Sequence, residues 1–162
     1  MLRRFFATDA STTLLFQRIV LGLVMFPHGA QKMLGWFGGG GWDKTMAMMS
    51  QGGLPKPLVA LVILGEFFGA LGLIVGLGTR LAAFGIASIM IGAIATVHAK
   101  VGFFMNWMGN QPGEGFEYHL LALALALPLI LRGAGAFSLD RGIARGLERR
   151  GPAGARAHGV PR

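Results

Sequence analysis

Residues 57–78 read PLVALVILGEFFGALGLIVGLG, an uninterrupted apolar run with a single acidic residue, Glu66, close to its middle. An α-helix rises about 1.5 Å per residue, so about 20 such residues cross the hydrocarbon core of a bilayer. The run does not alternate with period two, as a strand of a membrane barrel would. It therefore predicts a membrane-spanning helix, and a carboxyl group at that depth must face the protein interior or a water-filled cavity.

Three further stretches, at about 12–35, 81–99 and 116–137, are apolar over a similar length. Hydrophobic residues make up 53% of the 162 residues and charged residues only 14%, and the mean hydropathy is +0.58. Such a composition is too apolar for a soluble domain of this size. We therefore expect an all-α fold: an integral membrane four-helix bundle within residues 1–140, followed by a basic cytoplasmic tail at 141–162.

The net charge of +8 raises the question of nucleic-acid binding, but its distribution favours a topological origin. Arginine precedes the first stretch, lies in the turn between the second and third, and closes or follows the fourth: Arg3, Arg4, Arg80, Arg132, Arg141, Arg145, Arg149, Arg150, Arg156 and Arg162. Basic residues on alternate loops follow the positive-inside rule, which predicts an N-in and C-in topology. The expected partner is the lipid bilayer, with no nucleic acid.

The connecting segments carry amphipathic signals of their own. In the first external loop, 36–56, Trp42, Met46 and Met49 are spaced as on one face of a helix, which predicts a short interfacial helix. In the tail, Leu139, Ile143 and Leu147 recur every four residues among arginines, which predicts a basic amphipathic helix on an anionic leaflet. We expect the chain beyond Gly151 to be disordered.

Small residues recur along two of the predicted spans. The second carries Gly65, Gly69, Gly72 and Gly76, and the third carries Gly85, Ser88, Gly92 and Thr96. Small residues four apart let two helix backbones approach closely. Both faces are therefore expected to pack against other helices.

Polar residues in the first span share one face with each other. With Arg18 set at 0° and about 100° per residue, Lys32 falls near −40° and His28 near −80°, although Arg18 and Lys32 lie about 21 Å apart along the axis. Glu66 must therefore be neutral or pair with one of these cations. Two readings stay open. Glu66 and Arg18 form a buried structural ion pair, or Glu66 transfers protons or contacts a ligand.

The histidines converge on one side of the expected membrane. His98 ends the third stretch and His119 begins the fourth, at a depth similar to or above that of His28. A metal site is one reading, because imidazole is a common ligand, but the spacings match no recognised motif and we expect no metal. The chain has no cysteine, so it cannot itself run thiol exchange or hold a thiolate-ligated cluster.

These residues form an ordered set of short motifs. Along the chain stand Arg18, Gly22, Phe26-Pro27-His28-Gly29, Lys32, Gly53-Leu54-Pro55, Glu66, Gly76-Leu77-Gly78-Thr79-Arg80, His98, Gly135 and Ser138-Leu139-Asp140. In order and spacing the set resembles the DoxX family of small four-helix bacterial membrane proteins, over about 18–140. The resemblance implies a multi-pass protein of the bacterial cytoplasmic (inner) membrane. It also implies an oxidoreductase connection, since the namesakes are associated with a thiosulfate:quinone oxidoreductase and some relatives with membrane complexes in oxidative-stress defence.

Three functions follow as hypotheses. The first is a quinone-binding subunit of a membrane redox complex, in which Glu66 and His28 are the catalytic residues and Arg18, His28, Lys32, Glu66 and His98 contact the ligand. It has no covalently bound cofactor, binds quinone, and relies on membrane or peripheral redox partner proteins. The second is a non-catalytic scaffold or accessory subunit. The third is a small-solute or proton transporter, which would have to be a homo-oligomer because four helices are few for a monomer.

Overall fold

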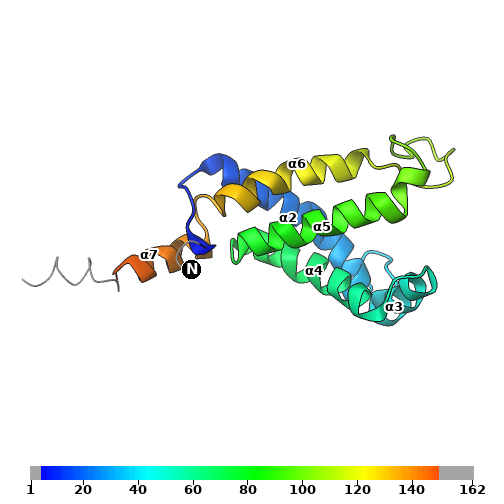
Figure 1. Cartoon of the computed structure of the whole chain (residues 1–162), viewed down its shortest axis with the longest axis horizontal. Coiled ribbons are helices and arrows are strands. Elements are labelled where there is room, and N and C mark those ends of the chain that lie inside the picture. The colour runs from blue at the N-terminus through cyan, green and yellow to red at the C-terminus, as the bar shows by residue number, and fades with distance from the viewer. Residues whose placement is uncertain (1–4, 150–162) are drawn as a thin grey trace, which may run out of the picture.

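The computed structural model describes residues 5–149, and every regular element in that range is helical (Figure 1). Four long helices run lengthwise: α2 (Thr12–Met33), α4 (Lys56–Val75), α5 (Thr79–Thr96) and α6 (Glu117–Arg132). Short helices follow three of them, namely α3 (Gly41–Gln51), a 3-10 turn (His98–Lys100) and α7 (Leu139–Arg149). The expected all-α fold is confirmed. The end of the bundle at which α3 lies is called the α3 end, and the opposite end, where α7 begins, is called the α7 end.

Three helices, α2, α4 and α5, are long and apolar enough to cross a membrane, which makes the chain a multi-pass membrane protein. The expected fourth span is shorter than the apolar stretch that suggested it, because α6 ends at Arg132 rather than near residue 137. Gly133 and Gly135 take left-handed backbone angles, with φ of 87° and 78°, and these angles end the helix. A membrane crossing by α6, and the N-in and C-in orientation, stay predictions.

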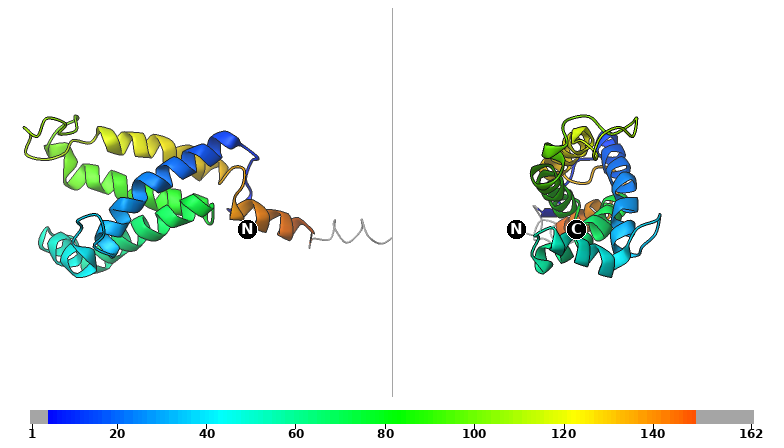
Figure 2. Two further views of the ribbon diagram at one scale, coloured as in Figure 1. Left: turned by 180° about the vertical axis from the view of Figure 1, so that it is seen from behind. Right: turned by 90° about the vertical axis from the view of Figure 1, so that its right-hand side faces the viewer.

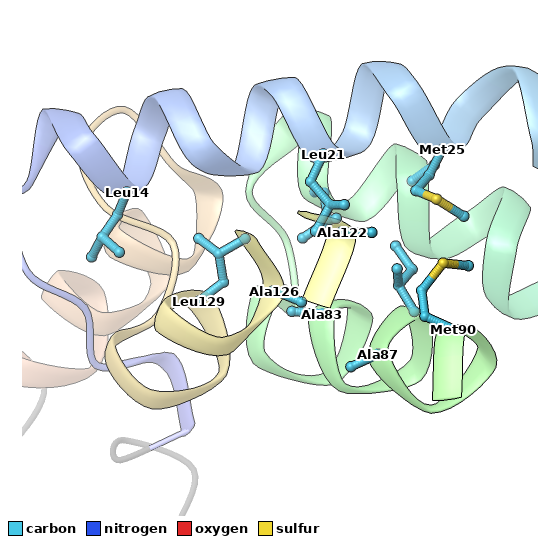
Figure 3. Close-up of a cluster of buried hydrophobic side chains, with 12 residues drawn as sticks. Leu14, Leu21, Met25, Ala83, Ala87, Met90, Ala122, Ala126 and Leu129 are labelled. Carbon is cyan, nitrogen blue, oxygen red and sulfur yellow. The ribbon is translucent and has the colours of Figure 1, made fainter. Parts of the chain in front are cut away.

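The four long helices form a closed ring around one apolar core, as the view along the long axis shows (Figure 2). α2 packs most extensively on α4, and α6 packs on α5, whereas the seam between α2 and α6 is the least extensive of the four. Figure 3 shows the core side chains that meet on the axis. They are Leu14, Leu21, Met25, Ala70, Leu73, Ala83, Ile86, Ala87, Met90, Ala122, Ala126 and Leu129.

The close contact between α2 and α4 depends on glycines of α2. A Cβ atom at Gly29 would lie 2.6 Å from the backbone of Phe67, and one at Gly22 would lie 2.8 Å from Ile74. The small-residue face expected on α5 behaves differently: a Cβ at Gly85 or Gly92 would meet nothing within 4 Å. The prediction that this face of α5 packs on another helix of the chain is therefore wrong, because Gly85 and Gly92 face away from the neighbouring helices.

The α7 end is held together by charged groups bonded to backbone. Asp140 is 3% exposed, and its carboxylate accepts hydrogen bonds from the amides of Gly78 (2.7 Å) and Thr79 (2.9 Å), where α5 begins. An acidic group there satisfies orphan N–H donors and the positive end of the helix dipole. Arg80 donates to the carbonyls of Ile130 and Leu131 in the last turn of α6, at 2.6 Å each.

The amphipathic segment after α6 is helical, as expected. In Figures 1 and 2, α7 continues roughly along the long axis and away from the four helices. Because Asp140 at its start is bonded to the turn before α5, this direction is set by the bundle. The disorder expected beyond Gly151 falls outside the described residues.

Candidate functional site

The ion pair at the centre of the candidate site joins α2 and α4. The Nζ atom of Lys32 lies 2.6 Å from the Oε2 atom of Glu66. The Glu66 side chain is only 5% exposed, whereas that of Lys32 is 27% exposed at the α3 end. The close packing at Gly29 positions the pair, because it brings the backbone of α2 against Glu66 and Phe67. The acid therefore has a cationic partner inside the bundle.

Two aromatic residues stand beside this pair, at the seam between α2 and α6. The His28 and Tyr118 rings have centroids 5.8 Å apart, and the Tyr118 hydroxyl donates to the sulfur of Met25 at 3.3 Å. His28 directly precedes Gly29, which packs against the backbone of Glu66 and Phe67. His28 is exposed at the seam, and Tyr118 is half-buried. A carboxylate, an imidazole and a phenol thus converge from three helices.

The remaining histidines of the described chain form a close, tilted ring pair next to Tyr118. The rings of His98 and His119 have centroids 4.1 Å apart and an interplanar angle of 44°. His119 is 6% exposed, whereas His98 is half-buried and its Nδ1 atom lies 2.8 Å from the carbonyl oxygen of Glu114. The expected convergence of His28, His98 and His119 at one end is confirmed by these contacts.

Arg18 lies elsewhere, at the α7 end, and is not the partner of Glu66. It is 1% exposed, and its guanidinium donates to five backbone carbonyls. These belong to Leu73 and Ile74 near the end of α4 and to Ala134, Ala136 and Phe137 after α6, at 2.6–3.3 Å. All five N–H groups of an arginine are thereby used. The reading of a structural pair between Arg18 and Glu66 is wrong, because Lys32 holds the carboxylate instead.

Two apolar grooves open on the sides of the bundle. The first, of about 310 Å³, lies between α5 and α6 and is lined by Phe84, Ala87, Ser88, Ile91, Leu123, Leu127 and Ile130. The second, of about 220 Å³, lies at the α2–α6 seam and is lined by Leu21, Val24, Tyr118, Leu121, Ala122 and Leu125. Only the second has a titratable residue in its wall. Its Tyr118 also contacts the ring of His28.

A metal centre is not what this cluster resembles. Among residues 5–149, no group of three or more histidine, cysteine, aspartate or glutamate side chains is arranged to hold a metal ion. The sequence-based site omitted Tyr118, which supplies the wall of the groove. Tyr118 is the only tyrosine of the chain, one residue before a histidine at the start of a predicted span, and that position was a usable signal.

Comparison with known proteins places these features in a family. The family model described as DoxX matches residues 13–99, which include His28, Lys32, Glu66 and His98. The chain belongs to the DoxX family. It is also similar to the protein named "Putative oxidoreductase CatD" of Bacillus subtilis (strain 168), with 30% identity over 132 residues, which are 82% of this chain and 87% of that protein. No solved structure matches significantly.

The motifs by which the sequence resembles DoxX proteins separate into two places in the fold. Arg18, the turn at residues 76–80 and Asp140 meet at the α7 end, where a Cβ on Gly76 would lie 3.1 Å from the Arg18 guanidinium carbon. His28, Lys32, Glu66 and His98 lie toward the α3 end. The first group joins helix ends through backbone contacts, and the second carries titratable groups. Chemistry is therefore to be sought at the α3 end of this DoxX protein.

Proposed function

We propose that this DoxX protein is a quinone-binding subunit of an oxidoreductase complex in the bacterial inner membrane. The observation that carries the proposal is the apolar groove at the α2–α6 seam, which reaches Tyr118 beside His28 and the Lys32–Glu66 pair. A ligand with an apolar tail and a polar head fits this combination. Membership of DoxX and the oxidoreductase name of its relative support a redox role.

The proposed pose follows from the polarity of the groove. The isoprenoid tail lies against Leu21, Val24 and Leu125, which exchanges lipid contact for protein contact. The quinone ring reaches the end of the groove, where His28 and Tyr118 donate hydrogen bonds to its oxygens. Entry is lateral from the bilayer, through the least extensive helix seam.

The proposed chemistry assigns protons to this chain and electrons to a partner. Reduction of a quinone to a quinol takes up two electrons and two protons. His28 and Glu66 each take up a proton and pass it to one of the two oxygens, and Lys32 pairs with the Glu66 carboxylate between transfers. The described chain has no cysteine to pass electrons, so a redox partner protein delivers them.

Quinone binding to the purified protein tests the proposal. Decylubiquinone is titrated into protein in detergent, and binding is followed by quenching of tryptophan fluorescence. We expect Glu66→Gln and His28→Ala to weaken binding by about tenfold, since a hydrogen bond to a charged group contributes about 1.5–3 kcal/mol. Failure of the wild-type protein to bind, or wild-type affinity in both variants, would reject the site.

A matched pair of groove variants controls for general damage. Val24 and Ile91 are both exposed on the bundle surface, and they line the α2–α6 and α5–α6 grooves respectively. Val24→Trp is expected to block decylubiquinone binding, whereas Ile91→Trp is expected to leave it unchanged. The opposite result would move the binding site to the α5–α6 groove.

A second candidate, the non-catalytic accessory subunit, is favoured by α7. This helix projects from the bundle (Figure 2). At about 100° per residue, its exposed Leu139 and Ile143 fall on one face, and Arg141 and Arg145 fall on the opposite face. Such a helix suits docking of an acidic partner. A chain ending after Gly142 keeps Asp140 and therefore the α5 cap. Loss of co-purifying proteins from this truncated chain, with quinone binding absent from the full chain, would favour the second candidate.

A further inference from the structure

The tilted histidine pair contains a buried nitrogen without a hydrogen-bond partner. The Nδ1 atom of His119 is inaccessible, and none of the described residues bonds to it. Buried polar atoms are bonded in the great majority of cases, so an exception calls for a cause such as a catalytic role. His119 lies outside the contacts assigned to the quinone above. Its neighbours are His98 at 4.1 Å and Tyr118 at 5.5 Å between ring centroids.

The tautomer of His98 follows from its own contact. Its Nδ1 atom lies 2.8 Å from the Glu114 carbonyl oxygen, which can only accept, so Nδ1 carries the proton. In the neutral ring, Nε2 then has the free lone pair. His98 is half-buried at the outer loop, beside the exposed segment that follows it, and can exchange with water. A half-buried ring thus lies against a ring that is only 6% exposed.

We propose that His119 is a proton relay between His98 and the buried site around Glu66. Its ring contacts His98 from the 3-10 turn and Tyr118 on its own helix, and Tyr118 in turn contacts His28 from α2, whose neighbour Gly29 packs against Glu66 of α4. This inference rests on the proposed function for its purpose, because quinone reduction consumes protons at a site away from water.

Each step of the relay conserves the number of protons. Water protonates His98 at Nε2, and the resulting imidazolium passes that proton to a nitrogen of His119 after a ring rotation. His119 releases a proton from its other nitrogen toward His28 and Glu66. Each neutral ring then holds as many protons as before, and one proton has moved from water to the site.

Exchange of the His119 ring proton with water tests the relay without any quinone. Full-length protein labelled with ¹⁵N-histidine is studied by NMR in detergent micelles, and the His119 signal is assigned by its loss in His119→Gln. His98→Gln keeps a donor for the Glu114 carbonyl but cannot be protonated, and His98→Phe keeps the ring contact. We expect exchange to slow by about tenfold or more in both, because acid–base groups accelerate proton transfer by about 10²–10⁴-fold.

Thr96→Val is the matched control, since its hydroxyl bonds only to Gly92 in its own helix at the same end of α5. We expect this variant to exchange as the wild type does. Exchange that is unchanged or faster in both His98 variants would overturn the relay. Quinone binding with unchanged exchange would reject only the relay, and His98-dependent exchange without quinone binding would reject only the proposed function.

Discussion

At the scale of single residues, the cations Arg18 and Lys32 of α2 have different tasks. Arg18 donates to five carbonyls from two chain segments, whereas Lys32 makes one short contact with Glu66. A guanidinium is always charged and has five donors in a fixed fork, which suits the first task. An ammonium is a compact group that can follow a carboxylate, which suits the second.

Replacement of Arg18 should therefore damage the fold rather than the site. Arg18→Met leaves several buried carbonyls unpaired, at about 1–3 kcal/mol each, so we expect stability to fall by about 3 kcal/mol or more. Thermal unfolding followed by circular dichroism in detergent measures this. Arg132→Met is the control, because Arg132 pairs with Asp9 at the surface and exposed pairs contribute about 1 kcal/mol or less. Equal losses in both variants would contradict the account.

Replacement of Lys32 should expose the cost of a buried carboxylate. We expect Lys32→Met to lose about 3 kcal/mol, because Glu66 stays buried without a cation. The double variant Lys32→Met with Glu66→Met should regain most of that loss, since two apolar side chains can replace a buried pair. Chemical unfolding of both variants checks this, and a double variant less stable than Lys32→Met would argue against a coupled pair.

The sequence predicted which residues are polar and share a face, but not which partner each one takes. Arg18 and Lys32 both reach α4, whereas His28, predicted on the same face, lies beside Tyr118 of α6. Depth separates them, and three of the five partners of Arg18 are carbonyls of residues 134–137, whose arrangement depends on left-handed Gly133, Gly135 and Phe137. Backbone acceptors leave no side-chain pattern in a sequence. Lys32 was one of the three partners considered for Glu66, and only the packing of the helices identifies it as the partner.

At the scale of helices, the fold depends on where glycine is needed for close approach. Gly29 sits against the backbone of Phe67, whereas Gly92 on α5 has open space around it. Hydropathy predicted both helices but could not distinguish these glycines, because a small residue has the same signature whether it faces a helix or the lipid. The predicted α6 likewise extended too far, because Gly133 and Gly135, which end the helix, lie in a stretch that is still apolar.

Alanine at the two glycines should give opposite results. Gly29→Ala places a methyl group 2.6 Å from backbone atoms of α4, so the helices must separate, and we expect a loss of about 1–3 kcal/mol together with weaker binding at the site. Gly92→Ala should be neutral or stabilising by about 0.5–1 kcal/mol, because alanine favours helix. Thermal unfolding of the two variants compares them directly. A destabilised Gly92→Ala would mean that this face is covered in the membrane.

At the scale of the whole molecule, the account requires α6 to cross the bilayer although it is only 16 residues long. The chain lacks cysteine, so single cysteines report position without background. With a membrane-impermeant maleimide, we expect Asn110→Cys to react in intact spheroplasts and Arg145→Cys to react only after lysis. Reaction of both from one side would mean that α6 does not cross, and the reverse pattern would invert the topology.

The central claim is that a quinone lies at the α2–α6 seam with its head beside His28 and Tyr118, and photoaffinity labelling tests it most directly. The full-length protein is irradiated with an azido-quinone, with and without excess decylubiquinone, and labelled residues are identified by mass spectrometry. The account predicts that the labelling removed by the competitor falls on α2 between Leu21 and Lys32 and on α6 between Tyr118 and Leu125. Competed labelling confined to α5, or no competed labelling, would contradict it.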